Sequence, residues 1–122
     1  MNYHHEKRRF PRANYPCSLT IWKGHSFGTV NANMANIGAG GLLVYLNEGL
    51  MIGAKVEIKI DFSKEKSLEC TGLVLRSHQN REDPEEYPAP HSVAIAFQGL
   101  DEAKVSFIKK LVEELSNTES SN

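Results

Sequence analysis

Three arginines stand close together near the start of the chain, in the stretch "EKRRFPR" at residues 6–12. Arg8, Arg9 and Arg12 surround a phenylalanine and a proline, just ahead of a segment with the pattern of a strand. A guanidinium pairs with phosphate oxygens through two parallel hydrogen bonds. The cluster therefore fits a local anion site, and the alternative interpretation is a solvated basic tail.

A second polar segment, "NIGAGGL" at residues 36–42, holds three glycines in four positions. Glycines permit positive backbone angles and let a ligand approach the main chain, and Asn36 carries both a hydrogen-bond donor and an acceptor. A tight turn or bulge at a barrel corner would use the same residue types. The segment is not a P-loop, because no lysine and hydroxyl residue follow the glycines, and it lacks the following helix of a dinucleotide fingerprint.

Six segments have the alternating or compact apolar pattern of strands, and these strands must position both polar segments. The clearest is "KVEIKIDF" at residues 55–62, where apolar residues alternate with charged ones, the period of a strand with one buried face. The predicted strands are residues 17–22, 27–33, 41–46, 55–62, 67–78 and 92–97.

One helix is predicted after the last strand. Asp101 is the expected N-cap, and apolar residues recur at helical spacing from Val105 to Leu115. The polar tail "SNTESSN" at residues 116–122 has no such period, so we expect it to be disordered.

The length and the strand pattern predict one small barrel. A chain of 122 residues with 40% hydrophobic content can form a single domain with one core. Short strands of this number can close or nearly close into a barrel, which removes exposed edges, and one helix can then cover an open end or a side. We expect a basic arm at residues 1–16, a barrel at 17–99 and a helix at 101–115, together forming one domain over residues 1–115.

The charge balance and the hydropathy argue against several functional classes. The 14 Lys and Arg residues are balanced by 15 Asp and Glu residues, for a net charge of -1, whereas proteins that coat nucleic acid carry a strong basic excess. No segment has the apolar core of a signal peptide or the roughly 18 apolar residues of a membrane span. We therefore expect a cytoplasmic protein that has no membrane span and binds neither DNA nor RNA.

The reactive side chains show no catalytic or metal-binding pattern. Cys17 and Cys70 are two strand-borne thiols far apart in the chain, so we expect them to be reduced and buried rather than part of a disulfide framework. The five histidines show no metal-ligand spacing with one another or with the cysteines. No nucleophile motif or pair of carboxylates can be assigned, and we predict neither an enzyme nor a metal site.

Two patterns follow one another along the chain: R-x-x-x-R from Arg8 to Arg12, and N-x-G-x-x-G from Asn36 to Gly41. With these patterns, the strand order, the "GLVLRS" and "VAIAFQGL" strands and the closing helix, the chain resembles the PilZ domain family over residues 6–115. The resemblance implies a mainly β fold, a six-stranded antiparallel β-barrel with one C-terminal helix. It also implies a receptor for cyclic di-GMP, a bacterial second messenger, which the family binds through R-x-x-x-R and D/N-x-S-x-x-G. By this resemblance, Arg8, Arg12, Asn36 and Gly41 bind the ligand.

Gly38 departs from the family pattern, which has serine at this place. A missing hydroxyl removes one hydrogen bond, a loss of about 0.5 to 1.5 kcal/mol, so we expect binding to be weakened rather than abolished. Gly41 could leave room for a purine against the barrel wall. Arg9 either contacts the ligand or points to solvent, and Arg76, at the end of "GLVLR", is interpreted as an arginine at the barrel rim rather than a ligand contact.

The main hypothesis is a non-enzymatic cyclic di-GMP receptor with no other cofactor and with an unidentified downstream protein as partner. Its predicted binding residues are Arg8, Arg9, Arg12, Asn36, Gly38 and Gly41. The first alternative is a degenerate PilZ-like adaptor that has lost the nucleotide and acts through protein contacts. A second alternative is a barrel that binds single-stranded nucleic acid through arginines and aromatic residues, although the nearly neutral overall charge argues against it.

Overall fold

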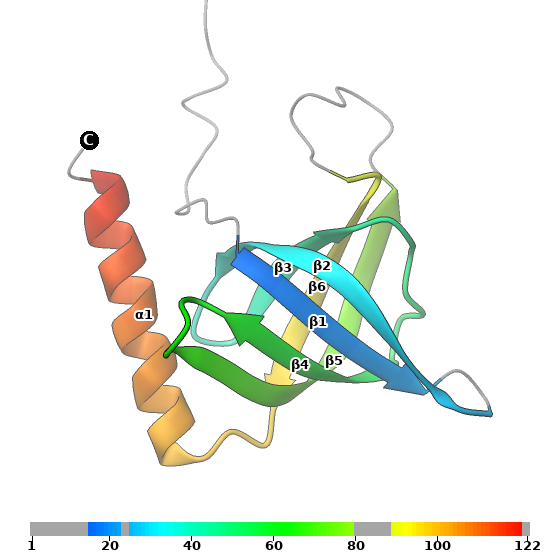
Figure 1. The fold of residues 1–122 in the computed structure, drawn as a ribbon, viewed down its shortest axis with the longest axis horizontal. Coiled ribbons are helices and arrows are strands. Elements are labelled where there is room, and N and C mark those ends of the chain that lie inside the picture. Colours follow the sequence, from blue (N-terminus) through cyan, green and yellow to red (C-terminus); the bar gives the residue numbers. More distant parts are fainter. Residues whose placement is uncertain (1–14, 23–24, 80–88, 121–122) are drawn as a thin grey trace, which may run out of the picture.

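The computed structural model describes residues 15–22, 25–79 and 89–120, and its strands precede its helix (Figure 1). In these ranges six strands are followed by one helix, as predicted. The strands are β1 (Tyr15–Trp22), β2 (Phe27–Ile37), β3 (Gly41–Leu46), β4 (Lys55–Asp61), β5 (Ser67–Gln79) and β6 (His91–Gln98), and the helix is α1 (Glu102–Ser120).

The strands form a closed barrel in the order β1-β2-β3-β6-β5-β4, and every neighbouring pair is antiparallel. Leu19 on β1 illustrates the closure, because it pairs with Val30 on β2 and with Ile58 on β4. A closed barrel leaves no strand edge free to pair with another chain. The predicted fold, a mainly β six-stranded antiparallel barrel with one C-terminal helix, is confirmed.

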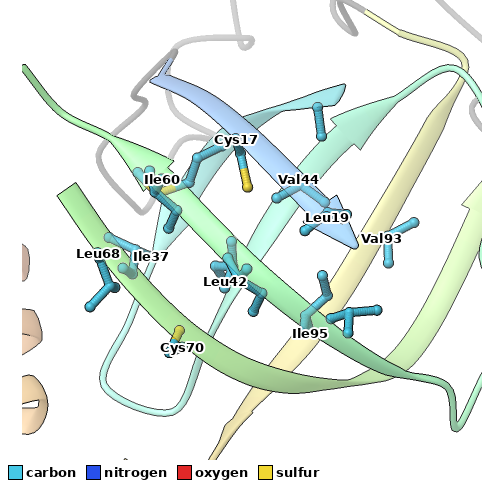
Figure 2. Packing of buried hydrophobic residues seen from close by; sticks show 14 of the residues in the cluster. Cys17, Leu19, Ile37, Leu42, Val44, Ile60, Leu68, Cys70, Val93 and Ile95 are labelled. Carbon is cyan, nitrogen blue, oxygen red and sulfur yellow. The ribbon is translucent and has the colours of Figure 1, made fainter. Parts of the chain in front are cut away.

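Alternate side chains of the strands fill the interior of the barrel (Figure 2). On β4, Val56, Ile58 and Ile60 are at most 2% exposed, whereas the charged residues between them are exposed. Burial of apolar surface of this kind stabilises the fold by about 25 cal/mol per Å². Cys17 and Cys70 are free thiols buried in the same core, as expected.

Most strand boundaries lie within two residues of their predicted positions. The largest shift at a strand start is at β1, which begins at Tyr15, so residues 15–16 belong to the barrel rather than to the arm. The remaining arm residues lie outside the described residues. The assignment of residues 1–115 to one domain stays a prediction.

β2 is longer than predicted, because it runs to Ile37 instead of ending at Asn33. A register shift between Met34 and Asn36 forms a bulge in its pairing with β3. Met34 and Ala35 are both buried there. Two consecutive buried residues break the two-residue period on which the prediction rested, and this is the usual effect of a bulge.

α1 starts with the predicted cap but ends later than predicted. The backbone N–H of Lys104 donates to Asp101 Oδ1 at 2.8 Å, which satisfies one of the free donors of the first turn. The helix continues to Ser120, so the expected disorder was wrong for residues 116–120. No glycine or proline interrupts residues 102–120, and hydrogen bonding propagates readily along a helix once it is nucleated.

α1 packs against one end of the barrel, beside the turn that joins β4 to β5 (Figure 1). Ile108 and Leu111 are buried in the same cluster as the barrel interior. Phe62, which follows β4, has its ring centroid 5.1 Å from that of Tyr15 and 6.0 Å from that of Phe107. These three rings connect the first residue of β1 to the helix.

Two glycines near the β2–β3 turn differ in the space around them. At Gly41, an added Cβ would overlap the carbonyl oxygen of Ile95 and lie 3.1 Å from the Cα of Ala96. β3 and β6 therefore approach each other so closely that a side chain does not fit between them. An added Cβ at Gly38 has no atom within 4 Å.

Phe62→Ala should loosen the contact between α1 and the barrel, because it removes the ring that touches both Tyr15 and Phe107. A buried Phe→Ala change costs about 3 to 5 kcal/mol, and for this partly buried ring we expect the free energy of unfolding to fall by about 2 kcal/mol in urea denaturation. Phe27→Ala is the matched control, because its ring is 68% exposed and its loss should cost less than about 1 kcal/mol. Equal losses in the two variants would contradict the packing role of Phe62.

Gly41→Ala should destabilise the barrel, because the added methyl group would overlap the main chain of β6. Overpacking of this kind costs about 1 to 3 kcal/mol, which urea denaturation would detect as a lower unfolding midpoint or as failure to fold. Gly38→Ser is the control, and its open surroundings predict a change below about 0.5 kcal/mol. A Gly41→Ala variant with the parent's midpoint would show that β3 and β6 can move apart without cost.

Candidate functional site

Three of the predicted site residues line one cavity on the outer wall of the barrel. Asn36, Gly38 and Gly41 border a cavity of about 400 Å³, which extends over the outer faces of β3, β6 and β5. A volume of this size is within the range of small-molecule sites. The structure therefore brings together the three residues taken from the second sequence pattern.

Small side chains on β6 form the floor of the cavity. Ala94 and Ala96 line it, whereas the alternate residues Val93 and Ile95 point into the core. Methyl groups leave the main chain close to the surface, so a flat ligand group can approach the barrel wall. At Gly41 an added Cβ would overlap the carbonyl oxygen of Ile95, so β3 and β6 meet closely there, and the role of Gly41 beside a purine stays a prediction.

Asn36 reaches the cavity because of the bulge in β2. Met34 and Ala35 are buried, and the register shift leaves Asn36 half-buried on the outer face, opposite Leu43 on β3. Asn36 is therefore a strand residue, although we expected this strand to end at Asn33. A strand holds its side chains more rigidly than a loop does, which favours a fixed position for the amide.

Main-chain hydrogen bonds fix the turn between β2 and β3. The N–H of Gly38 donates to the carbonyl of Gly41 at 2.8 Å, and the N–H of Phe97 on β6 donates to the carbonyl of Gly40 at 2.9 Å. None of these three glycines has a positive φ, so the expected use of positive backbone angles was wrong. The segment is therefore a tight turn at the barrel corner, and it also forms one wall of the cavity; its role in binding a ligand stays a prediction.

The opposite wall of the cavity comes from a second bulge, in β5. Leu75 and Arg76 line the cavity. Leu75 faces outward by strand alternation, and a register shift between Val74 and Arg76 places Arg76 on the outer surface as well. Leu75 is 49% exposed. Arg76 pairs with Ala94 of the cavity floor, so the residue that we interpreted as a rim arginine lies on the cavity wall.

A signal in the sequence could have identified this wall. The buried residues of β5 are Leu68, Cys70, Gly72 and Val74. Strict alternation would put Arg76 inside the barrel, where an unpaired guanidinium is strongly unfavourable. An arginine at an inward position therefore predicts a bulge just before it.

The arginines of the first pattern, Arg8, Arg9 and Arg12, lie outside the described residues. Tyr15 is the first described residue, and it pairs with Met34 next to the β2 bulge. The chain therefore enters the barrel beside the part of β2 that carries Asn36.

The thiols of the core do not provide a reactive site. Burial raises the pKa of Cys17 to about 12 and the pKa of Cys70 to about 11. Both thiols are therefore protonated at neutral pH, and the thiolate is the reactive form. Across the described ranges, no three His, Cys, Asp or Glu side chains are placed to hold a metal ion, and no helix is long and apolar enough to cross a membrane.

Solved structures with the same fold include proteins from two bacteria. The PilZ domain with c-di-GMP of YcgR from Escherichia coli matches with a TM-score of 0.71 at 13% identity, covering 94% of this chain and 95% of that one. YcgR from Escherichia coli in complex with c-di-GMP matches with a TM-score of 0.68 at 12% identity, covering 94% and 48%. The Bacillus subtilis inhibitor of motility, MotI/DgrA, matches with a TM-score of 0.64 at 15% identity, covering 92% and 52%. At these identities the likeness shows the fold alone, and the chain spans about half the length of the last two.

The family comparison covers nearly the whole chain, although no curated protein matches it. The model of the PilZ domain matches residues 6–114 of the 122. This range contains the whole barrel, both sequence patterns and most of α1. The chain therefore belongs to the PilZ domain family.

Proposed function

We propose that this chain is a receptor for cyclic di-GMP, a binding module without enzymatic activity. The observation that carries the proposal is the cavity shared by Asn36, Gly38 and Gly41, which stand at the places of the D/N-x-S-x-x-G pattern. The shared fold adds support, because the PilZ domain of YcgR was solved with c-di-GMP.

The chemistry of the cavity suits the base of such a ligand. Cyclic di-GMP carries two guanine bases and two phosphate charges. The alanine floor accepts a flat ring, and Asn36 can donate to or accept from the edge of a base. The turn itself carries no cation, and we assign the phosphate contacts to Arg8 and Arg12, with Arg9 as a third candidate.

The connection at Tyr15 favours an arm that reaches the cavity. Tyr15 pairs with Met34, which lies two positions before Asn36 on β2. Three residues of extended chain span at most about 11 Å, so the length of the chain allows Arg12 to reach the end of β2 that carries the Asn36 amide. An arginine in this segment can therefore meet a ligand bound over the barrel wall.

The output of the receptor is a change in shape or in affinity for a downstream protein. The proposal requires no cofactor besides the nucleotide, and it places the receptor in the cytoplasm. Neither DNA nor RNA is part of it, because the chain has no basic excess.

A ligand-free adaptor is the second candidate, and Gly38 favours it because the hydroxyl of the family pattern is missing. Another observation in its favour is an exposed aromatic pair at the tip of the β1–β2 hairpin. Trp22 and Phe27 are 54% and 68% exposed, with ring centroids 4.9 Å apart. Exposed apolar surface of this kind is typical of protein contacts. The inhibitor of motility MotI/DgrA shares the fold.

Calorimetric titration separates the two candidates. The purified chain is titrated with cyclic di-GMP, and with GTP and cyclic di-AMP as controls for charge and for base identity. Binding of cyclic di-GMP in preference to both controls supports the receptor. A folded protein that binds none of the three supports the adaptor and overturns the receptor.

Arg8→Ala and Arg12→Ala should each weaken cyclic di-GMP binding by about ten- to 150-fold, because each removes charge-assisted hydrogen bonds of about 1.5 to 3 kcal/mol. Asn36→Ala should weaken it less, by about two- to tenfold, because a neutral hydrogen bond is lost. Calorimetry measures all three, and Lys59→Ala serves as a control for charge because Lys59 is exposed on β4 away from the cavity. If both arginine variants bind as tightly as the parent, the ligand site is elsewhere.

Gly38→Ser should preserve or tighten cyclic di-GMP binding, because it restores the hydroxyl of the family pattern. The open space around Gly38 and its ordinary φ allow a side chain without strain. The gain expected from one added hydrogen bond is at most about tenfold in affinity. A clear loss of affinity with an unchanged unfolding midpoint would mean that the serine role of the family does not transfer to this position.

A further inference from the structure

Arg76 is a cavity residue that belongs to neither sequence pattern. It lines the same cavity as Asn36, Gly38 and Gly41. It is the one arginine within the described ranges, and no described residue holds its guanidinium in a hydrogen bond or ion pair. The guanidinium is therefore free to contact a ligand.

Arg76 and Asn36 stand at the two ends of one row of paired residues across four strands. Asn36 pairs with Leu43 on β3, and Leu43 pairs with Ala94 on β6. Ala94 pairs in turn with Arg76 on β5. Neighbouring strands lie about 4.8 Å apart, so the row is about 14 Å long along the wall. A flat heterocycle fits over Ala94 with an amide at one end and a guanidinium at the other.

The bulge in β5 turns Arg76 to the outer face, beside Leu75, which strand alternation already places there. An extra residue in one strand re-aims the side chains around it. Leu75 is 49% exposed and lines the cavity. A ligand that lies over the alanine floor would cover this apolar surface, which gives the exposed leucine a function.

We propose that Arg76 selects guanine over adenine at this cavity. Guanine presents two acceptors, O6 and N7, on the edge that a guanidinium contacts through two parallel hydrogen bonds. Adenine presents N7 but has an amino donor in the place of O6, and this donor would face the donors of Arg76. The inference rests on the proposed function and names the residue that makes the receptor specific for its base.

Two substitutions of Arg76 test this role by calorimetry with cyclic di-GMP and cyclic di-AMP. Arg76→Ala should weaken cyclic di-GMP binding by about ten- to 100-fold and should change cyclic di-AMP binding much less, because a bidentate pair is lost for guanine only. Arg76→Gln should bind cyclic di-AMP more tightly than Arg76→Ala does, since a glutamine amide matches the N6 and N7 groups of adenine. Lys59→Ala should leave both affinities unchanged, and unfolding midpoints confirm that each variant is folded.

The outcomes separate this inference from the proposed function. A parent protein that binds no cyclic di-GMP overturns both. A parent that binds selectively, together with an Arg76→Ala variant of unchanged affinity and selectivity, overturns only the role of Arg76. Equal weakening of both dinucleotides in Arg76→Ala would make Arg76 a charge contact and would overturn its role in selecting the base.

Discussion

The two-residue alternation of a closed barrel is the constraint on which the candidate site depends. A strand that keeps it sends every second residue into the core, as β4 does. β2 and β5 each break the alternation once, between Met34 and Asn36 and between Val74 and Arg76. The two bulges lie on opposite sides of the β3–β6 pair, and the cavity lies between them. The candidate site is thus the part of the wall where regular pairing is interrupted.

The floor of the cavity is held in place by the packing of β6. At Gly41 an added Cβ would overlap the carbonyl oxygen of Ile95, and at Gly72 it would overlap the Cγ2 of the same residue. Ile95 therefore packs directly against Gly41 and Gly72, and no larger residue fits at either position. This close packing restricts the position of β6 and so of its neighbouring residues Ala94 and Ala96, which form the cavity floor. When the floor is already rigid before binding, less conformational entropy is lost on binding.

Residue patterns predicted the regular parts of this fold and missed the irregular ones. The compact apolar run predicted β3 without error, and Asp101 predicted the cap of α1. Alternation could not predict the β2 bulge, because the small Ala35 is compatible with either face. It was also insufficient for Arg76, whose place on the cavity wall depends on a register shift with β6. Glycine-rich composition suggested positive backbone angles in the turn, but main-chain packing against β6 decides its conformation instead.

The continuous pairing of strands around the barrel also limits which parts of the protein can change shape when a ligand binds. Every strand is hydrogen-bonded on both sides, so a ligand cannot reshape the wall without breaking paired residues. The helix α1 lies outside these paired strands, and the predicted arginine arm precedes Tyr15 in the sequence. Tyr15 joins them, because it pairs with Met34 beside the cavity and its ring contacts Phe62, which in turn contacts Phe107 of α1. Cyclic di-GMP held by the arginines before Tyr15 would therefore act on a residue that also supports the helix, and the surface offered to a partner would change there while the barrel keeps its shape.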